Sequence, residues 1–191
     1  MTRRLVALPL VVLFALGLGG CGQTERQGGS PAVDAWVDDV CESGLRWRED
    51  LARRARHLTD ELDTADDLEE ARNRYVAYFD DAVDRTDELL EDLDGAGAPA
   101  LERGEDVARD LRAAFATAHR VFADARAQAR RLPPDDGDAF EREIRDLSAT
   151  LEERAQTLDD AFRRIDTYGL EELDRAFAAN SDCRELAGRG R

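Results

Sequence analysis

Apolar residues recur every seven positions through residues 99–131, and this spacing limits the fold more than any other feature of the chain. The pattern consists of two interleaved sets: Leu101, Ala108, Phe115, Phe122 and Ala129, and Gly104, Leu111, Ala118, Ala125 and Leu132. Two such positions in every seven place one apolar seam along an α-helix. The alanines in the seam let a neighbouring helix approach closely. The segment therefore predicts a long helix with one buried face.

Three more long segments have helical spacing, at roughly 32–63, 65–94 and 138–168, and a short one covers roughly 170–179. The segment at 138–168 repeats the seven-residue spacing at Ile144, Leu151, Leu158 and Ile165. Alternation typical of strands is missing from the sequence. The chain is therefore expected to be all-α.

Residues that favour helix ends lie between these segments. We expect Thr64 to cap the second helix and Asp138 to cap the fourth, because short oxygen-bearing side chains accept bonds from free helical N–H groups. Pro99 is expected at the start of the third helix. Gly169 suits the position just after the fourth.

Short connections make neighbouring helices antiparallel. The sequence therefore predicts an antiparallel up-down-up-down four-helix bundle with a short C-terminal helical appendage. We assign residues 32–187 to this domain and expect a disordered tail at residues 188–191.

The first twenty residues have the layout of a secretory signal peptide. Two positive residues, Arg3 and Arg4, precede the apolar run Leu5 to Leu18, which is too short for a comfortable membrane-spanning helix. The two arginines also permit a twin-arginine export signal. The following residues, 21–31, are polar and rich in glycine, and they are expected to form a flexible tether.

The stretch Leu18-Gly19-Gly20-Cys21 resembles a bacterial lipobox. This resemblance implies cleavage between Gly20 and Cys21 and a diacylglycerol on the Cys21 thiol. Such a lipid would hold the protein at the extracytoplasmic face of the cell membrane. The alternative is an ordinary cleaved signal that happens to precede a cysteine.

Lipidation of Cys21 would leave two cysteines, Cys41 and Cys183. Outside the cytoplasm an even pair predicts a disulfide. Four antiparallel helices also return the chain to the end of the bundle where Cys41 lies, shortly before Cys183. The alternatives are two free buried thiols and a metal-binding pair, and the latter lacks further ligands because His57 lies at the far end of its helix.

Several of these features together resemble small secreted helical lipoproteins of actinobacteria. They are the lipobox, the Trp36 and Cys41 pair, Trp47, the glycine–proline break before residue 100 and the late Cys183 to Leu186 segment. The resemblance implies a helical fold and an envelope location, and it implies no activity.

Composition argues against nucleic-acid binding. The net charge is −16, and all 27 basic residues are arginine. A field of this sign repels nucleic acids and anionic lipids. Acids and arginines are interspersed along the chain, as on solvated helix faces. An acidic docking patch and an adaptation to high salt are the alternatives.

Motifs for catalysis or metal binding are missing from the sequence. The Glu-x-x-His pairs of di-iron bundles would need glutamate at Arg54 and Ala116, ahead of His57 and His119. The acidic run 135–138 lacks the spacing of a calcium loop. Phosphate-binding and nucleophile motifs are absent as well. We expect neither an enzyme nor a bound cofactor or metal.

Five aromatic residues are candidates for a partner or ligand surface, and core packing is the alternative: Trp36, Trp47, Tyr75, Tyr78 and Phe79. The stripe from Trp36 to Cys41 is expected to receive the C-terminal appendage. The sequence thus favours a membrane-anchored lipoprotein with a binding or structural role. An accessory subunit of an envelope complex and a bundle that binds a small apolar ligand are the alternatives.

Overall fold

A computed structural model describes the backbone of residues 31–166 and 168–186, and the side chains of residues 32–154 and 168–186. Six α-helices follow one another: α1 (Pro31–Asp63), α2 (Leu68–Ala96), α3 (Gly104–Ala129), α4 (Gly137–Asp166), α5 (Glu171–Ala179) and α6 (Ser181–Leu186). The described residues contain no strand. The all-α prediction is confirmed, and five helices match the expected segments. The sixth, α6, was not expected.

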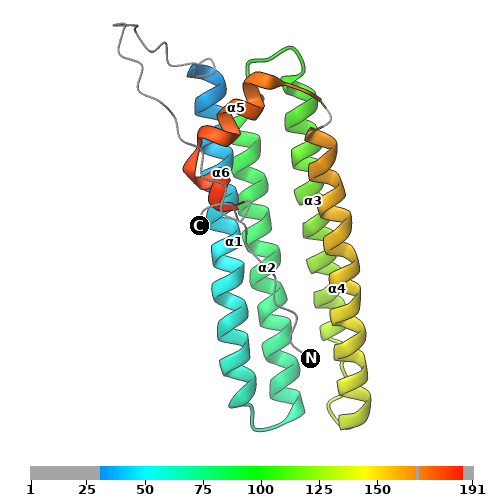
Figure 1. Cartoon of the computed structure of the whole chain (residues 1–191). Helices are drawn as coiled ribbons and strands as arrows, with labels where there is room; N and C mark the ends of the chain where they lie inside the picture. The colour runs from blue at the N-terminus through cyan, green and yellow to red at the C-terminus, as the bar shows by residue number, and fades with distance from the viewer. Residues whose placement is uncertain (1–30, 167, 187–191) are drawn as a thin grey trace, which may run out of the picture.

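The long helices pack in sequence order, α1 with α2, α2 with α3 and α3 with α4, while α5 and α6 both pack on α1. Figure 1 shows the α1–α2 and α3–α4 turns at one end of the molecule and the α2–α3 connection at the other. Both short helices lie at the end that holds the α2–α3 connection (Figure 1). We call this the clipped end and the opposite one the distal end.

Two of the expected helix caps are wrong, because a nearby aspartate takes each position. At α2 the cap is Asp67, whose side chain accepts a 2.8 Å hydrogen bond from the backbone of Glu70. Thr64 instead donates to the Glu61 carbonyl at the end of α1. At α4 the backbone N–H of Ala139 bonds Asp136 at 3.0 Å, and Asp138 already lies inside the helix.

The third helix starts five residues later than Pro99. Residues 99–103 form a turn in which the Leu101 N–H donates to the Pro99 carbonyl at 2.7 Å. Gly104 then begins α3 directly against Pro99. Gly169 has a φ of +62°, which agrees with its expected position after α4.

Gly104 is required because a side chain at this position would collide with the turn. A Cβ atom would lie 1.9 Å from the Pro99 carbonyl oxygen. We expect Gly104→Ala to lower the free energy of unfolding by about 2 kcal/mol or more, as overpacking does. Urea unfolding followed by circular dichroism measures this loss.

The matched control is Gly95→Ala in α2. A Cβ there would meet nothing within 4 Å beyond its chain neighbours and the backbone of its own helix. Alanine loses less backbone entropy than glycine in a helix, so this variant should gain up to about 1 kcal/mol. Equal effects of the two substitutions would contradict the close contact at Gly104.

The core is divided into two clusters. The cluster at the clipped end takes residues from α1, α2, α3, α5 and α6, and its largest members include Trp36, Leu89 and Phe115. The distal cluster takes residues from α2, α3 and α4, including Phe79 and Phe140. Ala125 and Ala129 of α3 belong to the distal cluster, and half-buried Ala108 packs against the one at the clipped end, as the seven-residue pattern predicted.

A buried hydroxyl links α1 to α2 near the middle of the helices. Thr86 on α2 is fully buried, and its Oγ1 donates to the Ala82 carbonyl at 2.7 Å. The same oxygen accepts a 3.0 Å hydrogen bond from the indole nitrogen of Trp47 on α1. Both polar groups are thereby satisfied, and the bond helps to fix the register of α1 against α2.

Candidate functional site

The predicted attachment point, Cys21, lies outside the described residues, together with the leader, nearly all of the tether and the tail at 188–191. Of the predicted site residues, the two paired cysteines and the five aromatic residues can therefore be placed.

Cys41 and Cys183 form a disulfide, as the sequence predicted. Their Cα atoms lie 5.0 Å apart across a sequence separation of 142 residues. Cys41 lies near the start of α1 and is 2 % exposed, and Cys183 lies in α6 and is 8 % exposed. The bridge therefore fastens the last two helices to the first.

The segment from Glu171 to Leu186, which we call the clip, covers an apolar stripe on α1. Leu173 and Ala176 of α5 belong to the same buried cluster as Trp36, Val37 and Val40 of the stripe. This packing confirms the prediction that the stripe receives the C-terminal appendage (Figure 1).

Polar contacts hold the clip at both ends of α6. Asn180, between α5 and α6, donates to Asp38 on α1 at 2.6 Å and accepts a 2.8 Å bond from the backbone N–H of Cys183. Arg48 of α1 donates to the carbonyls of Glu185 and Leu186 at 2.6 and 2.9 Å. These bonds satisfy backbone groups at the start and at the end of α6.

Trp36 joins three parts of the clipped end. It is 4 % exposed, and its indole nitrogen donates to the Gly97 carbonyl in the α2–α3 connection at 3.0 Å. Its ring packs edge-on against the ring of Phe177 in α5, with the ring centroids 6.3 Å apart. Half-buried Trp47 packs edge-on against Phe115 in the same cluster, with the ring centroids 5.3 Å apart.

The other three aromatic candidates belong to the distal cluster. Phe79 is buried there, and half-buried Tyr78 packs against it with ring centroids 5.0 Å apart. The ring centroid of Tyr75 lies 6.4 Å from that of Phe140 in α4. Burial raises the pKa of both tyrosines. The five candidates therefore lie in two separate clusters and form no single surface.

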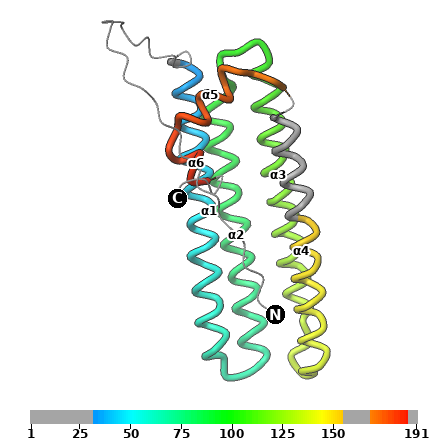
Figure 2. Tube along the Cα trace, viewed as in Figure 1, coloured from blue at the N-terminus to red at the C-terminus, as the bar shows by residue number. Residues whose placement is uncertain are grey.

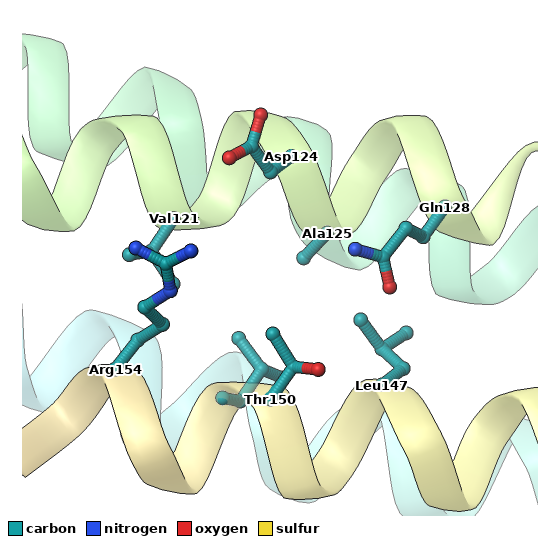
Figure 3. Close-up of a pocket in the computed structure, with 8 residues that line it drawn as sticks. Val121, Asp124, Ala125, Gln128, Leu147, Thr150 and Arg154 are labelled. Carbon is teal, nitrogen blue, oxygen red and sulfur yellow. The ribbon is translucent and has the colours of Figure 1, made fainter.

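A small pocket of about 50 Å³ opens between α3 and α4. Figure 3 shows Ala125 and Leu147 on the two helices, with Gln128 and Thr150 beside them. All of its lining residues come from these two helices: Val121, Asp124, Ala125, Gln128, Leu147, Thr150, Leu151 and Arg154. None of the five aromatic candidates lines this pocket.

A surface network connects α3 to the chain that leads into the clip. The Tyr168 hydroxyl donates to Asp110 at 2.5 Å, and the guanidinium of Arg103 lies 4.0 Å above the Tyr168 ring. The bond from Tyr168, followed by Arg109, holds the pKa of Asp110 below its usual range. This network was not predicted, because its two main partners lie 58 residues apart.

This network predicts a pH-dependent effect of Tyr168→Phe. A lowered carboxyl pKa stabilises the fold above its unfolded value of about 3.9, and the contribution is lost as the pH falls through the lower folded value. The variant should therefore be less stable than the wild type at pH 7, and the difference should be smaller at pH 2, where more of the Asp110 carboxyl is protonated.

Urea midpoints at the two pH values measure the effect. Phenylalanine retains a ring beneath Arg103, so the comparison isolates the hydroxyl. An equal difference at both pH values would contradict the role of Asp110.

The described part of the chain holds neither a cluster of metal ligands nor a helix that could cross a membrane. Among residues 32–154 and 168–186, no three His, Cys, Asp or Glu side chains gather as metal ligands would. Within the described ranges, every helix is too short or too polar to cross a membrane. No protein-family model, curated protein or solved structure matches the chain.

Proposed function

We propose that this protein is a lipoprotein of the cell envelope, anchored by a lipid on Cys21 at the extracytoplasmic face of the membrane. The observation that carries the proposal is the Leu18-Gly19-Gly20-Cys21 stretch behind a positive and then apolar leader. The Cys41–Cys183 disulfide supports it, because such bridges persist outside the reducing cytoplasm.

The proposed domain is an antiparallel four-helix bundle with the clip as its appendage. The order of packing along α1, α2, α3 and α4 and the alternating ends of their connections support this topology. In this arrangement α4 packs chiefly on α3, so the four helices follow one another in sequence order without close packing of α4 on α1 among the described residues.

In this proposal the clipped end faces the membrane. The tether leads into α1, which begins at that end (Figure 1). The distal end, with the turns at 64–67 and 130–136, would then point away from the bilayer and be presented to other envelope components.

The role we propose is binding or structural, and the partner is an envelope protein. A net charge of −16 disfavours nucleic acid. The α3–α4 pocket, at about 50 Å³, is well below the few hundred cubic ångströms that a typical ligand site needs. This pocket therefore gives no support to a small apolar ligand, and we propose a protein partner instead.

Membrane fractionation of cells that express the chain tests the anchor. The wild-type protein should sediment with membranes, and Cys21→Ser should be released into the soluble fraction. Cys183→Ser is the matched control, because it removes another thiol and should stay with the membranes. A Cys21→Ser variant that remains membrane-bound would contradict the proposed lipid anchor.

Site-specific photo-crosslinking tests the orientation. Asp39 is exposed near the start of α1, and Asp66 is exposed at the distal turn. A crosslinker at Asp39 should capture lipid, and one at Asp66 should capture protein. The reverse assignment would contradict the orientation.

A further inference from the structure

The two sulfurs of the disulfide have unequal surroundings. Cys41 belongs to α1, a helix of 33 residues, and shares a buried cluster with Leu89 and Leu93 of α2. Cys183 belongs to α6, a helix of six residues, and is the more exposed of the pair at 8 % against 2 %. Figure 2 shows α6 on the outside of α1.

Besides the disulfide, α6 is held by its packing on α1 and on α5. Its polar contacts include the Asn180 cap at its start, the Arg48 bonds at its end and the bonds from Arg184 to the last carbonyls of α5, and Leu186 lies against α1 at Gly44. A short helix with this support opens at a lower free energy than the whole domain, whereas Cys41 becomes accessible only when α1 leaves the core. Local opening therefore exposes Cys183 before Cys41.

The chemistry of thiol–disulfide exchange adds a directional constraint. A thiolate attacks one sulfur from the side opposite the sulfur that leaves. An attack on Cys41 must come through the core that α1 shares with the other helices. An attack on Cys183 comes from the side opposite the Cys41 sulfur, which belongs to α1. Local opening and the direction of attack therefore both favour the Cys183 sulfur.

We propose that the Cys183 sulfur is the site at which this protein exchanges with external thiols and disulfides, and that its partners are dithiol oxidoreductases or small thiols. In reduction, an external thiolate bonds to Cys183 Sγ, the bond between the two cysteine sulfurs breaks, and its electron pair leaves on Cys41. A mixed disulfide at Cys183 is the intermediate.

Formation of the bridge follows the reverse route. The Cys183 thiolate attacks the disulfide of the oxidant and releases one thiol from it. The Cys41 thiolate then attacks Cys183 Sγ and releases the second thiol. The cysteine pair loses two electrons, and the external disulfide gains them. This inference is independent of the lipid anchor.

Glutathione is the probe for this proposal. The full chain with Cys21→Ser has two cysteines, and its oxidised form is incubated with reduced glutathione in a urea series. Each sample is quenched with acid, the freed thiol is alkylated under denaturing conditions, and peptide mass mapping locates the glutathione. We expect at least ten times more glutathione on Cys183 than on Cys41, below the urea concentration at which the helices unfold.

Two results would overturn the assignment. One is glutathione found equally on both cysteines or mainly on Cys41. The other is exchange that begins only where circular dichroism shows the loss of the helices, since local opening would then play no part. An Arg48→Gln variant adds a second readout, because weaker support of α6 should speed exchange at Cys183 several-fold while the urea midpoint of the helices stays nearly constant.

Discussion

Reduction of the Cys41–Cys183 bridge is expected to lower the free energy of unfolding by about 3–5 kcal/mol. The bridge links residues 142 positions apart, so it removes many conformations from the unfolded chain. The urea midpoint, followed by circular dichroism at 222 nm with and without reductant, measures the loss.

A Cys41→Ala, Cys183→Ala double variant separates the two contributions of the bridge. Reduced wild-type protein retains both buried sulfur atoms, whereas the double variant also loses their packing. The variant should therefore be slightly less stable than the reduced wild type. An unchanged midpoint on reduction would contradict the view that the bridge constrains the unfolded chain.

Trp36→Ala should have a comparable effect, a loss of about 4 kcal/mol, because loss of a large buried side chain leaves a cavity. The indole also joins α1 to the Gly97 carbonyl and to the Phe177 ring of α5. Trp36→Phe retains an aromatic ring and loses the hydrogen bond, so about 1–2 kcal/mol is expected. Urea unfolding of both variants gives the comparison.

Trp47→Ala is the matched control for Trp36→Ala. Trp47 is only half-buried, and the Thr86 hydroxyl would keep its bond to the Ala82 carbonyl after the indole is removed. Trp47→Ala should therefore lower the free energy of unfolding by clearly less than Trp36→Ala does. A Trp36→Ala variant within about 1 kcal/mol of the wild type would show that this indole does not join the clipped end together.

The helices were predictable because their cores follow simple spacing. The seven-residue pattern of α3 placed Phe115 and Ala125 on a buried face, and both are buried. The disulfide was predictable because a topology inferred from that spacing brought Cys41 and Cys183 to one end. Periodicity was sufficient for the helices, and the disulfide also needed the lipobox, which leaves one pair of cysteines outside the cytoplasm.

The sequence did not predict features that depend on competition between neighbouring residues for one position, or on a bond between residues far apart in the chain. Thr64 and Asp138 are plausible caps, but Asp67 and Asp136 are better placed for the N–H groups that need a partner. The six-residue α6 is too short to display a period. The Tyr168–Asp110 bond joins surface residues from different parts of the chain, and spacing carries no information about it.

The most direct test of the lipoprotein account is the intact mass of the protein purified from its native membrane, followed by sequencing of its N-terminal peptide. The account predicts that the mature chain begins at Cys21 and that this residue carries diacylglycerol on its sulfur. An N-terminus elsewhere, or an unmodified Cys21 thiol, would contradict it.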